Sequence, residues 1–151
     1  MNKRGQASIE FMFLILISIV YLTTAVMPMA KNVQGIAYDT ENISRANGET
    51  QKIVNAITNI SMQSTGSKET LMVFIPENTV IFCAPTKISF TATLKEKPFP
   101  AQCNSLGVCV KEFTLPSTTQ MNCTQAQVAG PVATKIVIEK QQTQVAFYLG
   151  G

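Results

Sequence analysis

A run of twenty residues without any charged side chain, Phe11 to Ala30, constrains this chain more than any other feature. A helix rises about 1.5 Å per residue, so a helix of this length is roughly 30 Å long and matches the hydrocarbon core of a bilayer. Lys3 and Arg4 precede the run, and positive charge holds that end on the cytoplasmic side, which directs the rest of the chain outward. A secretory signal peptide has a shorter apolar core that ends in small residues. We therefore expect residues 6–30 to remain in the mature protein as a membrane helix.

A carboxylate at the head of this run, Glu10, is unusual because a charged group within a bilayer is costly and normally has a partner. The alternative is an interfacial glutamate that reaches the headgroups. The wider pattern is Lys3-Arg4-Gly5, then Gln6-x-Ser8-x-Glu10, then Leu14 and the apolar run. This pattern resembles the class III signal peptide of archaeal type IV pilins, and the resemblance covers only the N-terminal segment.

The resemblance implies how this segment is processed and what it does. In that family a membrane-embedded prepilin peptidase cuts between the residues that match Gly5 and Gln6, so residues 1–5 would be a removed leader. The glutamate that matches Glu10 serves assembly, and it can pair with the new amino group of Gln6 on a neighbour. The partners implied are identical or related pilin subunits in a helical homopolymer, an assembly platform in the membrane, and lipid before assembly.

Residues 31–66 show helical periodicity with one narrow apolar stripe. Ile36, Ile43, Thr50 and Ile57 recur every seven residues, and polar residues such as Asp39 fill the gaps. We expect the stripe to pack mainly on the chain's own C-terminal domain and the helix to end near residues 64–67. Before this region, Pro28 removes one backbone hydrogen bond and predicts an interruption near the outer end of the membrane helix.

From residue 67 onward the sequence changes to short apolar or alternating runs separated by turn residues. Six strands are predicted, at residues 71–75, 80–82, 88–94, 108–115, 135–140 and 144–149, and residues 116–131 are predicted to be a loop. The predicted fold class is α+β: a long N-terminal helix, membrane-spanning in its first half and amphipathic in its second, followed by an antiparallel β-rich head at residues 67–151.

Four cysteines lie beyond the membrane run: Cys83, Cys103, Cys109 and Cys123. An even number of cysteines in an exported chain predicts disulfides, and the intervals of 20, 6 and 14 residues do not match the paired C-x-x-C spacing of a zinc site. We favour Cys103–Cys109, which closes a short loop and leaves Cys83–Cys123, although spacing alone leaves all three pairings open.

The composition argues against nucleic-acid binding, metal binding and catalysis. The formal charge is +3, and loss of Lys3 and Arg4 with the leader gives 3 − 2 = +1, which does not indicate nucleic-acid binding. The chain has no histidine, so neither a histidine-based catalytic pair nor an ordinary metal site is expected. No phosphate-binding glycine loop occurs, and Glu77, Glu96, Glu112 and Glu139 are interpreted as ordinary solvated charges. We expect no enzyme activity and no cofactor.

Three sequons could accept N-linked glycans, at Asn42, Asn59 and Asn122. Asn42 and Asn59 must face away from the apolar stripe to carry sugar, and a disulfide at Cys123 would weaken the case for Asn122.

The expectation from the sequence is a structural, adhesive subunit of an archaeal type IV pilus-like filament. It would be a single-pass membrane protein as a precursor and part of an extracellular filament afterwards. Two alternatives stay open: an archaellin of a motility filament, and a membrane-anchored extracellular binding protein that does not polymerise.

Overall fold

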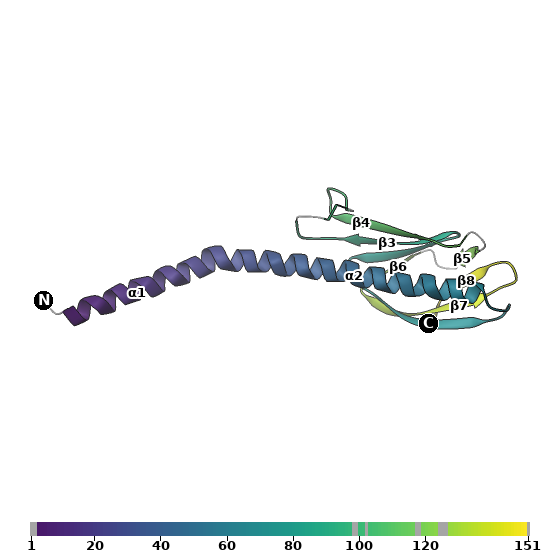
Figure 1. The fold of residues 1–151 in the computed structure, drawn as a ribbon, viewed down its shortest axis with the longest axis horizontal. Helices are drawn as coiled ribbons and strands as arrows, with labels where there is room; N and C mark the ends of the chain where they lie inside the picture. The colour runs from purple at the N-terminus through teal and green to yellow at the C-terminus, as the bar shows by residue number, and fades with distance from the viewer. Residues whose placement is uncertain (1–2, 98–99, 102, 117–118, 124–126, 151) are drawn as a thin grey trace. The chain divides into compact units, whose positions relative to one another are not determined.

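The computed structural model describes residues 3–97, 100–101, 103–116, 119–123 and 127–150. The chain divides into two compact units, Met1–Ala37 and Tyr38–Gly151. The helical part consists of α1 (Lys3–Tyr21), a π-helical turn η1 (Leu22–Val26) and α2 (Met27–Ser61), which follow one another directly (Figure 1). The first unit contains α1, η1 and the start of α2, and the second contains the remainder of α2 and all the strands.

The strands follow α2 in the second unit. They are β1 (Lys68–Ile75), β2 (Thr79–Ala84), β3 (Lys87–Thr93), β4 (Val108–Thr114), β5 (Met121–Cys123), β6 (Gln127–Ala129), β7 (Val132–Lys140) and β8 (Val145–Gly150). They form two four-stranded sheets with the orders β1-β7-β8-β5 and β4-β3-β2-β6. The β5–β8 pair is parallel and the other described pairs are antiparallel. The predicted α+β class is confirmed.

The prediction that residues 116–131 form a loop was wrong, because this stretch contains β5 and β6. Each of these strands is three residues long and pairs at only three positions, β5 with β8 and β6 with β2. A periodicity argument needs more residues than that. Both strands exist because distant parts of the chain offer them partners.

The element boundaries also differ from the prediction at the turn between helix and sheet. The helix ends at Ser61, and β1 begins at Lys68 rather than at residue 71. Gly66 lies between them with a φ of 91°, a left-handed conformation that glycine adopts without strain. The Nζ atom of Lys140 in β7 donates a hydrogen bond of 2.9 Å to the carbonyl of Ser61. This contact satisfies one of the helix's terminal carbonyls and fixes the helix end to the sheet.

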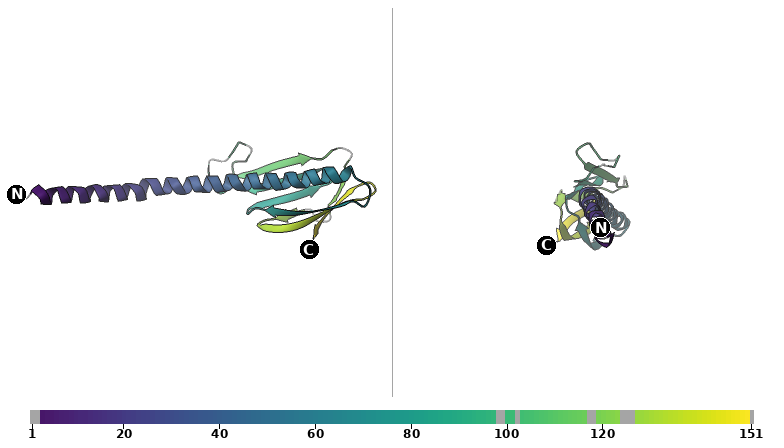
Figure 2. Two further views of the ribbon diagram at one scale, coloured as in Figure 1. Left: turned by 60° about the horizontal axis from the view of Figure 1, so that its bottom comes forward. Right: turned by 90° about the vertical axis from the view of Figure 1, so that its left-hand side faces the viewer.

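The core of the second unit lies between α2 and both sheets (Figure 2). Ile53, Ile57 and Ile60 of α2 are at most 1% exposed, and they share the core with large side chains such as Phe90 and Phe147. The expected packing of the apolar stripe is therefore confirmed for its C-terminal half. Val33, at the other end of the stripe, belongs to the first unit and is 65% exposed.

Two disulfides hold the strands of the second unit, and they include Cys103–Cys109, the pairing favoured because it closes a short loop. Cys83–Cys123 joins β2 to β5 and therefore links the two sheets, with a Cα–Cα distance of 5.9 Å. Cys103–Cys109 closes the short loop before β4. Within that loop, the Oδ1 atom of Asn104 accepts hydrogen bonds from the N–H groups of Leu106 and Val108, each 2.9 Å long.

Asp39, one of the polar residues between the positions of the apolar stripe, is buried. Asp39 is 7% exposed, and its Oδ2 atom accepts hydrogen bonds from the backbone N–H groups of Lys95 (2.9 Å) and Glu96 (3.0 Å). The carboxylate thus ties α2 to the segment after β3, and this loop lies 56 residues away in the sequence. Helical periodicity could not reveal it, because the partner is not on the helix.

We expect Asp39→Ala to lower the free energy of unfolding of the second unit by about 1–3 kcal/mol, since two part-buried N–H donors lose their buried acceptor. Asp39→Asn should cost less, because it keeps the volume and one acceptor oxygen. Denaturant unfolding of a chain that lacks residues 1–30 measures this difference. Glu41→Ala is the matched control, since Glu41 lies two residues further along α2, pairs with exposed Arg45 and should change little. Equal losses for Asp39→Ala and Glu41→Ala would contradict the role given to Asp39.

Candidate functional site

The N-terminal helix carries the residues that the sequence pattern singled out. The backbone of α1 is helical from Lys3, so Gly5, Gln6 and Glu10 all lie on one continuous helix. The structure gives no side-chain description for residues 3–8, and the interaction expected between Gln6 and Glu10 therefore lies outside what it describes. Glu10 itself is exposed.

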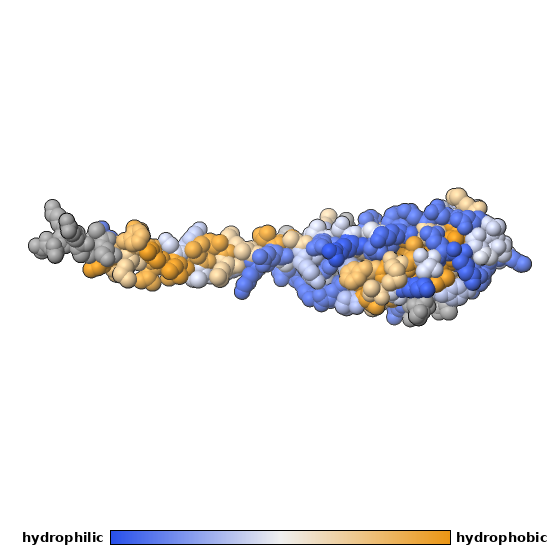
Figure 3. All heavy atoms as spheres, turned by 90° about the horizontal axis from the view of Figure 1, so that it is seen from below, coloured by the Kyte–Doolittle hydropathy of each residue, from blue (hydrophilic) through white to orange (hydrophobic). Residues whose placement is uncertain are grey.

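The helix after Glu10 presents apolar side chains all round its surface. Nearly all large hydrophobic residues from Ile9 to Leu22 are between 44% and 65% exposed. By length and composition, one helix in the described part of the chain could cross a bilayer, and its most apolar window has a mean hydropathy of 2.2 with none of it buried. Figure 3 shows this surface as the orange part of the helix. A helix that is apolar all round needs lipid or other protein around it.

The hydroxyl groups within the apolar run are satisfied by the helix's own backbone. Ser18 donates to the carbonyl of Leu14 (2.8 Å), Thr23 to that of Ile19 (2.9 Å) and Thr24 to that of Val20 (2.6 Å). Such bonds remove the need for water or for polar neighbours. These three residues can therefore face lipid without cost from an unsatisfied donor.

The interruption predicted at Pro28 takes the form of the π-helical turn η1. The N–H of Met27 donates to the carbonyl of Leu22, five residues earlier, directly before the proline. Proline has no N–H to donate and its ring crowds the preceding turn, and a wider turn just before it accommodates both effects. Thr23 and Thr24 supply extra donors to carbonyls next to this turn.

Glu10 differs from these hydroxyl residues in one respect. Among the residues whose side chains the structure describes, none makes a hydrogen bond or an ion pair with its carboxylate. A carboxylate without a partner is costly in an apolar environment, so a second group that satisfies it is strongly favoured. Glu10 is therefore the polar group on this helix with a reason to find a partner in another molecule.

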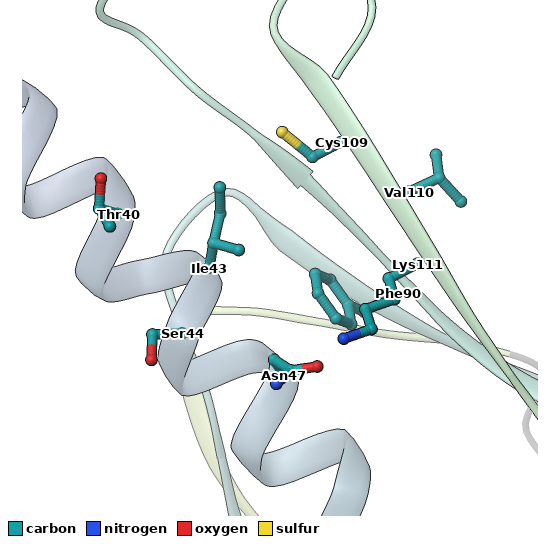
Figure 4. Close-up of a pocket in the computed structure, with 8 residues that line it drawn as sticks. All are labelled: Thr40, Ile43, Ser44, Asn47, Phe90, Cys109, Val110 and Lys111. Atoms are coloured by element: carbon teal, nitrogen blue, oxygen red, sulfur yellow. The ribbon is translucent and has the colours of Figure 1, made fainter. Parts of the chain in front are cut away.

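The second unit has a groove of about 400 Å³ between α2 and the β3–β4 edge. In Figure 4, Ile43 points toward Cys109 and Asn47 toward Phe90 across this groove. The Oδ1 atom of Asn47 is buried without a hydrogen-bond partner in the described chain. Lys111 is the charged side chain in the described lining, and Cys109 is in a disulfide, so this lining offers no acid–base pair for catalysis.

The other predicted site residues are spread over the second unit. Asn59 and Asn122 are exposed, whereas Asn42 is half-buried beside a smaller groove of about 230 Å³. Thr124, the third residue of the Asn122 sequon, lies outside the described residues. In the described part of the chain, no group of three or more cysteine, aspartate or glutamate side chains could hold a metal ion.

Comparison with known families matches the N-terminal segment. Residues 3–29 match the model of the family described as Class III signal peptide. Neither the curated proteins nor the solved structures contain a match to the chain. The match covers the residues in which Gly5, Gln6, Glu10 and the exposed apolar helix lie. It agrees with a membrane-anchored precursor that becomes a surface-exposed structural subunit of the pilin type. The N-terminal segment of this chain is therefore a class III signal peptide, and the chain is type IV pilin-like.

Proposed function

We propose that this chain is a subunit of an archaeal type IV pilus-like surface filament with an adhesive role. A prepilin peptidase would cut between Gly5 and Gln6, and an assembly platform in the membrane would add the mature subunit to a helical polymer of identical or related chains. One observation carries the proposal: the class III segment places Glu10, a carboxylate without a partner among the described side chains, at the head of an uncovered apolar helix.

The physical basis is an exchange of surroundings. Before assembly the helix is surrounded by lipid, and in the filament it would be surrounded by sister helices. Because lipid tails are as apolar as the side chains of Phe11–Ala30, this exchange gains little hydrophobic free energy. Close packing and satisfaction of Glu10 must then favour association. The new amino group of Gln6 on a neighbouring subunit is the partner that we propose for the Glu10 carboxylate.

The head would face the outside and carry the adhesive and modified surface. Among the three sequons, Asn59 has the best access, because it is exposed on the side of α2 away from the core. Asn122 is also exposed, whereas Asn42 is half-buried next to Phe74 and Glu77. We propose Asn59 as the first glycan acceptor to examine.

The class III segment is compatible with an archaellin as well, and filament morphology separates the two kinds of polymer. A membrane-anchored binding protein is favoured by a different observation, the groove beside Asn47 with its unsatisfied oxygen atom. Shearing of intact cells distinguishes this alternative. A filament subunit appears in the sheared fraction as fibres visible by electron microscopy, whereas an anchored monomer stays with the membranes and would contradict the proposal.

A further inference from the structure

Each sheet of the second unit has two outer strands, β1 and β5 in one sheet and β4 and β6 in the other. One outer strand of each sheet, β1 or β4, lies beside α2. The groove beside Ile43 separates α2 from β4, and the groove beside Asn42 separates α2 from Phe74 of β1. The helix α2 therefore lies between β1 and β4, and a neighbouring molecule could pair with either strand on its own side of the unit.

The hydrogen bonds of each outer strand show which backbone groups are unpaired. Leu94 donates to the carbonyl of Gly107 and Leu115 to that of Thr86, so the odd-numbered residues of β4 face β3. Alternate residues of an antiparallel strand face opposite neighbours. The backbone groups of residues 110, 112 and 114 therefore point outward. In the same way, Lys140 of β7 donates to the carbonyl of Ser67, so the odd-numbered residues of β1 face β7. The backbone groups of residues 68, 70, 72 and 74 therefore point outward.

The strand directions fit a contact between copies that share one orientation. β2 is antiparallel to β3 and β3 to β4, and the chain reverses direction between β1 and β2 across a three-residue connection (Figure 1). β1 and β4 thus run in opposite directions. When two copies lie side by side in the same orientation, β1 of the first copy meets β4 of the second in antiparallel orientation. Such a contact joins two different surfaces, so it does not close on itself and can extend into a filament.

Charge selects one register between the two strands. With residue 70 opposite residue 110 of the next copy, Glu69 lies opposite Lys111, and Lys68 lies opposite Glu112. In the described part of the chain neither Glu69 nor Lys111 has an ion-pair partner, and Lys111 lies 5.3 Å from the centre of the Phe113 ring. A shift by two residues places Glu69 opposite Phe113 and Leu71 opposite Lys111, which removes both pairings. Opposite charges at facing positions stabilise an antiparallel pair. This register supplies one new pair, Glu69–Lys111, and it brings together Lys68 and Glu112, which already pair with Glu139 and Lys87 of their own chain.

The same register also places the exposed apolar side chains of β1 beside those of β4 and of the loop before it. Met72 and Phe74 on β1 are 67% and 43% exposed, and the apolar surface on this side of the unit appears in Figure 3. Val110 on β4 is 54% exposed and lies at the rim of the groove (Figure 4). Leu106, in the disulfide-closed loop before β4, is 77% exposed and stands level with Phe74. The contact would cover apolar surface that the chain itself leaves open.

We propose that β1 of one copy pairs with β4 of the next copy, in the register that places Thr70 opposite Val110. The occupant of each edge is thus a second copy of this chain, and the two sheets continue from one head into the next. This inference rests on the proposed function, because it specifies a contact between heads within the filament. It adds main-chain hydrogen bonds and the Glu69–Lys111 ion pair to the contacts of the N-terminal helix.

Cysteine cross-linking of the full-length chain in filament-producing cells tests the register. The Cα atoms of a hydrogen-bonded antiparallel pair lie about 5.5 Å apart, within the range of a disulfide. Thr70→Cys with Val110→Cys should give a ladder of covalent oligomers when sheared filaments are oxidised and run without reductant. Thr70→Cys with Thr114→Cys is the matched control, since its two positions are four residues out of register and should give no ladder.

Charge reversal provides a second measurement that does not depend on added cysteines. Glu69→Lys and Lys111→Glu should each lower the yield of sheared filaments at least about fivefold, and the double variant should restore it to within about twofold of the parent. Filaments without a Thr70–Val110 ladder, or single reversals without effect, would overturn the strand pairing and leave the proposed function standing. A parent chain that forms no filaments would overturn the proposed function and the contact with it.

Discussion

Cells that produce Glu10→Ala are expected to export the protein into the membrane and to form no filaments. The charge-free run from Phe11 to Ala30 is unchanged, so insertion does not depend on the substitution. What is lost is the polar group that lacks a partner within the described chain and is satisfied by a neighbouring subunit in our proposal. Because lipid and sister helices are equally apolar, removal of this group takes away much of the preference for the filament. Immunoblots of membrane and sheared fractions measure both outcomes.

Two further variants separate the role of Glu10 from a general sensitivity of the helix. Glu10→Gln keeps the volume and the hydrogen-bonding capacity, so it should reduce filament yield less than Glu10→Ala does. Thr24→Val is the control within the same helix: its hydroxyl already bonds the carbonyl of Val20, and its removal should leave assembly intact. Normal filaments from Glu10→Ala, or equal defects from Thr24→Val, would refute the assigned role.

The second large effect is expected from Ile57→Ala in a chain that lacks residues 1–30. Ile57 is fully buried between α2 and the sheets, and truncation of a buried isoleucine to alanine costs about 2–5 kcal/mol because it also leaves a cavity. Ile53→Ala and Ile60→Ala should behave alike, since both side chains are at most 1% exposed. Denaturant unfolding followed by circular dichroism gives the free-energy difference.

Val33→Ala is the matched control for this series. Val33 belongs to the same apolar stripe but is 65% exposed, so its truncation should not change the stability of the shortened chain. It should instead reduce filament yield in the full-length protein, because sister subunits are the surface available to cover it. Equal losses of stability for Val33→Ala and Ile57→Ala would show that the stripe packs on the head along its whole length.

Much of the fold could be predicted because its signals are long. The helix extends over many turns, so its periodicity survives Gly48 and Pro28, and strands such as β3 alternate clearly between buried and exposed residues. β5 and β6 could not be predicted, since three-residue strands have no measurable period. The burial of Asp39 could not be predicted either, because it depends on two backbone N–H groups that reach α2 from a distant loop.

The candidate site shows the same division. The pattern of charge, glycine and Glu10 is local, and a family model describes the same residues. The open edges of β1 and β4 are not local: they follow from which strands end up outermost in two sheets, and the strand order depends on pairing between residues far apart. The opposite charges of Glu69 and Lys111 become meaningful only once both strands are known to lie at edges.

The mature N-terminus of protein sheared from the cell surface tests the central claim most directly. Mass spectrometry of the intact chain and of its N-terminal peptide should show that it begins at Gln6, with residues 1–5 absent. A peptide that lacks one ammonia would mean that Gln6 has cyclised, in which case Glu10 must bind backbone N–H groups or another donor in place of the amine. A surface protein that still begins at Met1, or one cleaved after Ala25 or Ala30, would contradict our proposal.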